Sequence, residues 1–175
     1  MVKSSACRHA LSRDLSAHDK PKPKFATSFG TKFMTDPQID GRKALIRRFY
    51  DELWNRWDYS VIAEILTEDV AFHGSLDVDA TGHDGFVAYA ETIRGAFPDF
   101  ENRVEDMVGE DNRVAACLTY SGTHEGSVMG IEATGRRIQY AGVGIFVFRE
   151  ELISHVWVLG DRLALLRQLT EPEND

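Results

Sequence analysis

The hydrophobic pattern of this chain changes its main period at Pro98, and that change limits the folds the chain can adopt. Before Pro98, most apolar residues recur every three or four positions, as they do on one face of an α-helix. After Pro98, apolar and polar residues alternate, as they do in strands that bury one side. Helices followed by an antiparallel meander are typical of an α+β fold. We therefore expect about three N-terminal helices packed on a mainly antiparallel sheet.

Two of the predicted helices carry long apolar faces, and a short helix and a short strand lie between them. The face of the first helix is formed by Ile46, Phe49, Tyr50, Leu53, Trp54 and Trp57. Asp58 is suited to cap the short second helix, because its carboxylate can accept a hydrogen bond from a free backbone N–H group. Residues 70–73 are expected to form the strand. Asp84 can cap the third helix, which ends at Pro98.

The second half of the chain has the pattern of four strands separated by turn residues. We expect these strands at residues 100–108, 114–124, 138–148 and 152–158. Gly142 and Gly144 lie inside the third of them and predict a bend or a bulge. A strongly curved sheet with helices on one face forms a cone, and the open end of a cone is a pocket. The expected architecture is therefore a cone-shaped α+β barrel.

The charge of the chain is divided unevenly between a basic tail and an acidic body. Residues 1–33 contain seven Lys/Arg against two Asp, a net charge of +5. The remainder contains 13 Lys/Arg against 26 Asp/Glu, a net charge of −13. An acidic body repels phosphate backbones, which argues against a nucleic-acid partner. Alternating Lys and Pro at 20–24 fits neither a helix nor a central strand, so we expect residues 1–33 to be a disordered, dispensable tail. Residues 34–175 are then expected to form one domain.

The cysteines, the hydropathy and the histidine spacing predict where the protein is found and whether it binds a membrane or a metal. Cys7 and Cys117 lie far apart in different contexts, so we expect no disulfide framework and a reducing, cytoplasmic setting. No apolar run approaches the length needed to span a membrane, so no membrane association is expected. The six histidines lack the spacing of zinc ligands, so we expect no metal.

Two polar residues at the ends of apolar strands are candidates for acid/base chemistry. Asp161 ends the segment WVLGD, and His124 lies in SGTHEG at 121–126. Burial in an apolar wall raises the pKa of a carboxyl group, and such a pKa suits proton transfer near neutral pH. The spacing by itself, however, favours an ordinary polar residue at a strand end. For His73 it does not decide between a site histidine and one satisfied by its strand-end neighbours.

Short motifs follow one another in a characteristic order over residues 40–170. They are HG at 73–74, GHDGF at 82–86, AFPD at 96–99, SGTHEG at 121–126, ATGRR at 133–137, WVLGD at 157–161 and LLRQL at 165–169. In this order and spacing they resemble the SnoaL-like polyketide cyclases, also called ester cyclases, of the nuclear transport factor 2-like superfamily. The superfold hosts many functions, so the resemblance bears more on fold than on reaction.

The resemblance implies an intramolecular aldol ring closure of an aromatic polyketide ester, a small hydrophobic substrate. Asp161 would remove an acidified C–H proton, and His124, or else His73, would hold or protonate the carbonyl oxygen as enolate charge develops. No metal or organic cofactor is implied, because the substrate itself delocalises the carbanion. Related proteins commonly pair, so we expect a homodimer formed through strands 114–120 and 138–148.

We expect the three catalytic candidates to converge in one pocket with an aromatic lining. The expected lining residues are Trp54, Trp57, Phe72, Tyr120 and Trp157. For Trp54 and Trp57, packing in the core fits the helical face better than lining a pocket does.

Two other functional classes stay open at the level of sequence. One is a different enzyme on the same cone, either a ketosteroid-isomerase-like proton shuttle or an epoxide hydrolase. Arg103 and Glu105 could be a fragment of an epoxide hydrolase site, but their alternation with other charges indicates a solvated strand face. The other class is a non-catalytic binder of small hydrophobic molecules.

Overall fold

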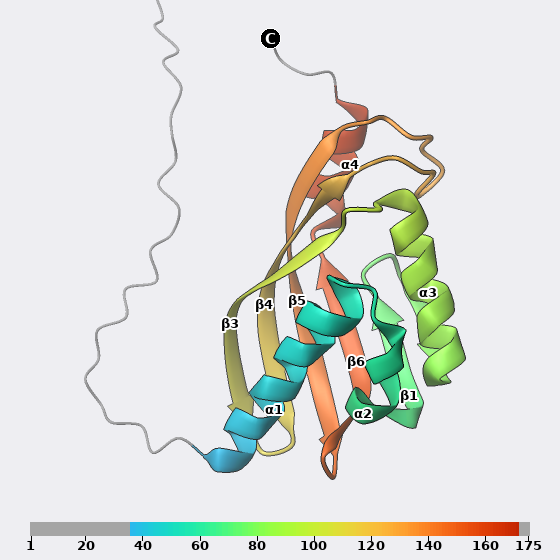
Figure 1. Cartoon of the computed structure of the whole chain (residues 1–175). Helices are drawn as coiled ribbons and strands as arrows, with labels where there is room; N and C mark the ends of the chain where they lie inside the picture. Colours follow the sequence, from blue (N-terminus) through green and yellow to red (C-terminus); the bar gives the residue numbers. More distant parts are fainter. Residues whose placement is uncertain (1–35, 172–175) are drawn as a thin grey trace, which may run out of the picture. The chain divides into compact units, whose positions relative to one another are not determined.

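The computed structural model describes residues 36–171, and the expectations for the tail at 1–33 lie outside the described residues. The expected helices and strands occur in the expected order, and a short strand at Val78–Thr81, where no strand was expected, is added to them (Figure 1). The helices are α1 (Pro37–Arg48), a π-helix η1 (Phe49–Trp54), a 3-10 turn η2 (Tyr59–Val61), α2 (Ile62–Ile65), α3 (Gly82–Ala96) and α4 (Arg162–Thr170). The strands are β1 (Leu66–Gly74), β2 (Val78–Thr81), β3 (Glu101–Glu110), β4 (Arg113–Thr123), β5 (Arg137–Arg149) and β6 (Leu152–Gly160).

The six strands form one sheet in the order β2-β1-β6-β5-β4-β3. Strands β3 to β6 form an antiparallel meander, and β1 joins it by pairing in parallel with β6. The sheet is curved, and α1, α2 and α3 lie over one of its faces, while α4 lies at the end where β6 finishes (Figure 1). The structure therefore confirms the expected α+β class and the mainly antiparallel curved sheet.

The core lies between the helices and the sheet face that they cover. Side chains on successive strand residues point to opposite faces, so every second residue of β4, β5 and β6 is buried. The Phe49 ring lies at the centre and contacts Phe146 of β5 edge to face, with centroids 5.4 Å apart, and Phe86 of α3 at 5.7 Å. We call the opposite sheet face, which these helices leave uncovered, the outer face.

Of the two aspartates that were expected to cap helices, one does so and the other does not. Asp58 caps η2 as expected, because its carboxylate accepts a hydrogen bond from the Ser60 N–H at 3.0 Å. The expectation that Asp84 caps α3 is wrong, since the helix begins at Gly82 and Asp84 lies within its first turn. Gly82 has a φ of 71°, a left-handed conformation that glycine adopts readily, and this lets the chain enter the helix earlier.

The first helix departs from α-helical geometry at Phe49. It continues as the π-helix η1, in which the Asn55 N–H donates a hydrogen bond to the Tyr50 carbonyl, five residues back. Such π-segments are rare and are frequent at functional sites. Apolar periodicity does not distinguish this segment from an α-helix, so the π-helix could not be predicted from the sequence.

Candidate functional site

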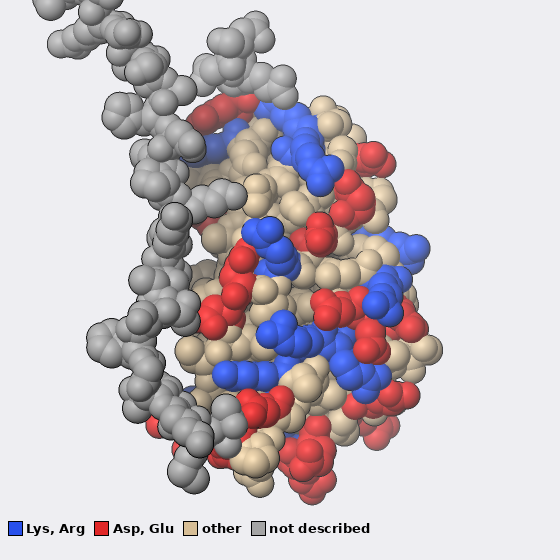
Figure 2. Space-filling model, turned by 60° about the vertical axis from the view of Figure 1, so that its left-hand side comes forward, with Lys and Arg blue, Asp and Glu red and all other residues tan. Residues whose placement is uncertain are grey.

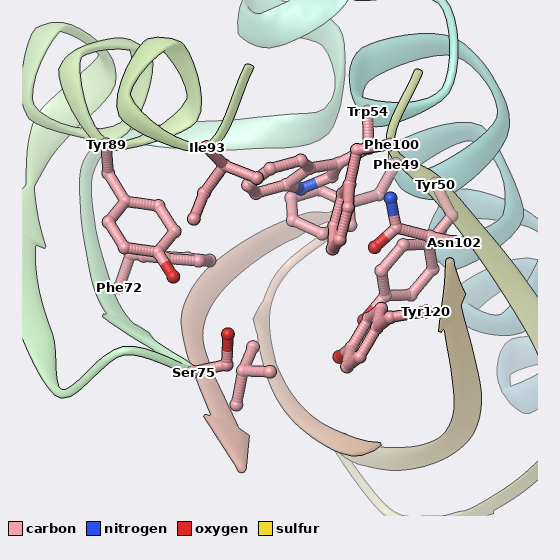
Figure 3. A pocket seen from close by; sticks show the side chains of 11 residues that line it. Phe49, Tyr50, Trp54, Phe72, Ser75, Tyr89, Ile93, Phe100, Asn102 and Tyr120 are labelled. Atoms are coloured by element: carbon pink, nitrogen blue, oxygen red, sulfur yellow. The ribbon is translucent and has the colours of Figure 1, made fainter. Parts of the chain in front are cut away.

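A cavity lies between the covered face of the sheet and the helices (Figure 3). The cavity is narrow: about 340 Å³ is free of atoms when the open mouth is included, but only about 20 Å³ of that space has room for the centre of a water-sized sphere. It is lined by Phe49, Tyr50, Trp54, Phe72, Ser75, Tyr89, Ile93, Phe100, Asn102, Tyr120 and Val158. Seven of these eleven residues are Phe, Tyr or Trp. An aromatic lining with few polar groups suits a small hydrophobic ligand.

The polar groups of the lining come from separate elements. Tyr50 belongs to η1 and Tyr120 to β4, and Figure 3 shows their rings on the same wall. Tyr89 of α3 lies on the opposite wall, and Ser75 follows the end of β1. Asn102 of β3 completes the set. Hydroxyl and amide groups at several points of an otherwise apolar cavity can orient a ligand that carries oxygen atoms.

Two glycines of β5 make room for the tyrosine rings. A Cβ atom on Gly142 would lie 2.2 Å from Tyr120 Cε2, and a Cβ atom on Gly144 would lie 2.8 Å from the Tyr50 hydroxyl oxygen. The sequence predicted a bend or bulge at these glycines, but the structure gives each a packing reason. β5 pairs with β4 without interruption at both positions, and its irregular register with β6 occurs instead between Val147 and Phe148.

Burial keeps the cavity phenols neutral. It raises the pKa of Tyr50 and of Tyr120, which are only 2% and 3% exposed, to values far above neutral pH. It also raises the pKa of Tyr89. A neutral phenol is a hydrogen-bond donor, and such donors can stabilise oxygen atoms on which negative charge develops.

The amide of Asn102 is held by a reciprocal pair of asparagines. Asn55, just after η1, donates to the Asn102 carbonyl at 3.0 Å. In return the Asn55 side-chain oxygen accepts from the Asn102 backbone N–H at 2.8 Å and from its side-chain amide at 3.1 Å. This pairing links the end of the π-helix to β3 and so fixes the two walls of the cavity relative to each other.

Asp161 lies at the end of β6, where α4 begins. Its carboxylate is exposed and accepts a hydrogen bond from the Ala164 N–H at 2.9 Å, so it acts as the N-cap of α4. The residue before it, Gly160, is close to the cavity, because a Cβ atom there would lie 3.2 Å from Ser75 Cβ. Asp161 is therefore a rim residue whose carboxylate is turned toward the helix and is not among the lining side chains.

His124 is fully buried just beyond the end of β4, but it does not line the cavity. Its Nδ1 atom accepts a hydrogen bond from the Thr134 N–H at 3.2 Å and lies 3.0 Å from the Thr134 hydroxyl. Its ring packs against Phe97, with centroids 5.4 Å apart. Burial lowers the pKa of His124, because the charged imidazolium is poorly solvated there.

His73 lies on the outer face, so the structure does not bring the three catalytic candidates into one cavity. Its Nδ1 atom is 2.7 Å from an Asp79 carboxylate oxygen, and its ring stacks on Trp157 at 5.9 Å. The cause is the alternation of β1, which points Phe72 into the cavity and therefore His73 away from it.

The expected aromatic lining is correct in part. Trp54, Phe72 and Tyr120 line the cavity. Trp157 does not, because alternation along β6 points Val158 inward and leaves Trp157 43% exposed on the outer face. Trp57 packs against the core beside Trp54, with centroids 5.8 Å apart, and does not line the cavity either.

Sequence reasoning missed four polar lining residues: Tyr50, Ser75, Tyr89 and Asn102. The two tyrosines were expected on buried helical faces, which was correct, but a buried phenol needs a partner for its hydroxyl, and that requirement could have singled them out. For Asn102, its place on the inward face of a strand was the available signal, because a buried amide must be held by hydrogen bonds.

Other kinds of site find little support among the described residues. On the face shown in Figure 2, Lys and Arg are interspersed with Asp and Glu, without a large patch of one sign. Within residues 36–171, no three His, Cys, Asp or Glu side chains gather in a way that could hold a metal ion. Across that same part of the chain, no helix combines the length and the apolar character needed to cross a membrane.

The curved sheet, its covering helices and the cavity between them define a protein of the nuclear transport factor 2-like class. Residues 44–169 match the family model described as SnoaL-like polyketide cyclase, and the chain belongs to that family.

Known relatives agree with this assignment. The chain is 30% identical over 140 residues to the aklanonic acid methyl ester cyclase DauD of Streptomyces sp. (strain C5). The aligned region covers 78% of this chain and 83% of DauD. It is also 30% identical to AclR from Streptomyces galilaeus, described as a candidate hydroxylase, with a TM-score of 0.65 over 78% of this chain and 85% of AclR. A candidate SnoaL-like polyketide cyclase from Jannaschia sp. CCS1 shares the fold at 20% identity, with a TM-score of 0.71 over 79% of this chain and 97% of that one.

Proposed function

We propose that this protein is a cofactor-independent cyclase that closes a ring of a polyketide ester by an intramolecular aldol reaction. Membership of the SnoaL-like family carries the proposal, and the apolar cavity with neutral phenols in its lining supports it. The similarity to DauD, a cyclase of aklanonic acid methyl ester, points to an aromatic ester as the substrate class.

The reaction needs only proton transfers and one new carbon–carbon bond. A base removes a proton from a carbon next to the ester carbonyl, and the resulting enolate carbon attacks a ketone of the same molecule. The ketone oxygen becomes an alkoxide and takes up a proton, so substrate and product have the same composition. The protein must bind the folded substrate, exclude water and stabilise negative charge on oxygen.

We assign the base to Asp161, as the sequence motif suggests. Its carboxylate is turned to the Ala164 N–H, but Gly160 places its backbone beside Ser75 at the cavity rim. For this role we propose that the carboxylate leaves the Ala164 N–H during the reaction and turns toward the mouth of the cavity. His124 and His73 remain lesser candidates, because neither lines the cavity and both have other partners.

The direct test is conversion of aklanonic acid methyl ester. Because ring closure leaves the mass unchanged, the product is detected as an isomer with a new chromatographic retention time. We expect the purified protein to form this isomer without added metal or cofactor, and the Asp161→Asn variant to form it at least about 10²-fold more slowly. If neither this ester nor related aromatic esters are converted, the remaining alternative is a non-catalytic binder.

We also propose that a second copy of the chain covers the outer face. Large apolar side chains are exposed there on neighbouring strands, namely Ile145 of β5 and Trp157 and Leu159 of β6. Soluble monomers rarely expose a continuous apolar patch of this kind, and a two-fold axis lets one patch cover its own copy. Light scattering at micromolar concentration should give twice the chain mass of 19.7 kDa. A species of 19.7 kDa alone would contradict this proposal.

A further inference from the structure

The hydroxyl of Tyr50 is buried without a hydrogen-bond partner. Within residues 36–171 it makes no hydrogen bond of ordinary geometry, although Tyr50 is only 2% exposed. An unpartnered buried hydroxyl destabilises a folded protein, and such groups are uncommon in native structures. Tyr50 lines the cavity, so its missing partner could be supplied by a ligand.

The surroundings of Tyr50 hold its hydroxyl in place. The ring packs edge to face against Phe49 at 5.1 Å and Phe146 at 5.9 Å, so it has little freedom to turn. Across from the hydroxyl lies Gly144, where even a Cβ atom would approach the oxygen to 2.8 Å. Glycine is therefore required at position 144, because any side chain there would collide with the Tyr50 hydroxyl.

A second phenol lies beside the first. The Tyr120 hydroxyl lies near the Tyr50 hydroxyl and, as a hydrogen-bonding neighbour, influences the pKa of Tyr50, although the two do not form a hydrogen bond of ordinary geometry. Both side chains line the same wall of the cavity (Figure 3). The Tyr120 ring stacks on Phe100 at 5.7 Å and contacts Tyr140 at 5.0 Å, so it too is fixed. Two fixed, neutral phenols therefore present hydroxyl groups in one region.

We propose that Tyr50 and Tyr120 together bind a single oxygen atom of the ligand, a carbonyl oxygen that becomes an enolate. Each hydroxyl donates one hydrogen bond to it, which gives the Tyr50 hydroxyl the partner it lacks. The pair would then discriminate in favour of ligands whose conjugated oxygen enters the cavity first. This assignment deepens the proposed cyclase function by naming the group that its cavity recognises.

Binding of small phenols tests the pair independently of turnover. The probe is 4-nitrophenol, whose oxygen resembles an enolate oxygen when ionised and whose absorbance reports its ionisation. The matched probe is 4-nitrotoluene, which has a methyl group in place of that oxygen. A hydrogen bond to a charged oxygen corresponds to a factor of about 10 to 100 in affinity, so Tyr50→Phe should weaken 4-nitrophenol binding by that factor. Binding of 4-nitrotoluene should stay unchanged.

A structural role for the Tyr50 hydroxyl predicts a different result. Removing an unpartnered hydroxyl should leave the melting temperature unchanged or raise it, whereas removing a structural hydrogen bond should lower it. Tyr120→Phe is a second variant, for which we expect a comparable loss of 4-nitrophenol affinity. Tyr59→Phe is the control, because the Tyr59 hydroxyl bonds to Glu91 outside the cavity at 2.7 Å and should not affect either probe.

Three outcomes would overturn the assignment. One is that the protein binds 4-nitrophenol no better than 4-nitrotoluene. Another is that Tyr50→Phe weakens both probes equally, which indicates general damage to the cavity. The third is an unchanged 4-nitrophenol affinity in Tyr50→Phe, and a lower melting temperature in the same variant would then assign its hydroxyl a structural role. If the phenol results hold but no ester is cyclised, the oxygen site stands and the proposed cyclase reaction fails.

Discussion

Asp161 has two roles that can be separated by two substitutions at one position. In the structure it caps α4 by accepting the Ala164 N–H at 2.9 Å, and in the proposed reaction it is the base. Asparagine keeps a side-chain oxygen that can accept the same hydrogen bond, but it cannot take up a proton. Alanine removes both the cap and the base.

The expected change in stability follows from the cap. Replacing an N-cap Asp by Ala lowers the free energy of unfolding by about 1 kcal/mol, within a range of roughly 0.5–2 kcal/mol. For a domain of this size that corresponds to a fall in melting temperature of about 2–4 °C. Asparagine caps a helix about as well, so Asp161→Asn loses only the attraction between the carboxylate and the helix dipole. That attraction is worth about 0.3 kcal/mol at an exposed site.

The expected change in turnover is the same for both variants. Loss of a general base slows a reaction by about 10²–10⁴-fold, whichever residue replaces it. The assay measures isomer formation from aklanonic acid methyl ester and thermal unfolding on the same preparations. Asp58→Asn is a matched control, since it changes an exposed capping carboxylate that accepts from the Ser60 N–H, away from the cavity. Wild-type turnover by Asp161→Asn would refute the assignment and leave Asp161 with the capping role alone.

Three further predictions concern packing, pH dependence and assembly. Gly142→Ala should lower the free energy of unfolding by about 1–3 kcal/mol and weaken ligand binding, because its Cβ would displace the ring of Tyr120. Chemical denaturation measures the change in stability, and titration with 4-nitrophenol measures the change in binding. Burial lowers the pKa of His124 in the folded state, so its contribution to stability is present above pH 6.5 and is lost as the pH falls below that value. His124→Asn, which keeps an acceptor for the Thr134 N–H, should flatten this decline in denaturation experiments at pH 7.5 and 5.5, and an unchanged slope would count against it. Ile145→Glu should shift the protein toward the monomer in light scattering, because it places a charge on the apolar outer face.

The fold was predictable because hydrophobic periodicity reports directly on burial. The change of period at Pro98 separates the helices from the meander, and the structure places α3 and β3 on either side of it. The π-helix at Phe49–Trp54 was not predictable, since its apolar spacing also fits an α-helix. The parallel pairing of β1 with β6 was not predictable either, because it joins segments about 85 residues apart and depends on the whole sheet.

The site was less predictable because it depends on which face each side chain occupies. Phe72 and His73 are neighbours in sequence and so cannot both point into the cavity from a regular strand. The same reasoning separates Val158 from Trp157, and it could have been applied to the sequence alone. The close approach of Tyr50 to Gly144 could not have been predicted from the sequence alone, because it requires knowing that η1 lies over β5.

The lining of the cavity limits where a proton can be removed. Its only titratable side chains are tyrosines, and burial raises the pKa of each, so none is a base near neutral pH. A base must therefore reach in from the rim, where Asp161 follows Gly160 beside Ser75. The proposed oxygen-binding pair, Tyr50 and Tyr120, occupies a different part of the lining from Ser75 (Figure 3). In a conjugated aromatic ester these two sites can still cooperate, because charge created at the carbon that loses the proton spreads through the ring system to a distant oxygen. Neutral donors fixed at that oxygen then stabilise the charge where it accumulates, rather than where the proton leaves.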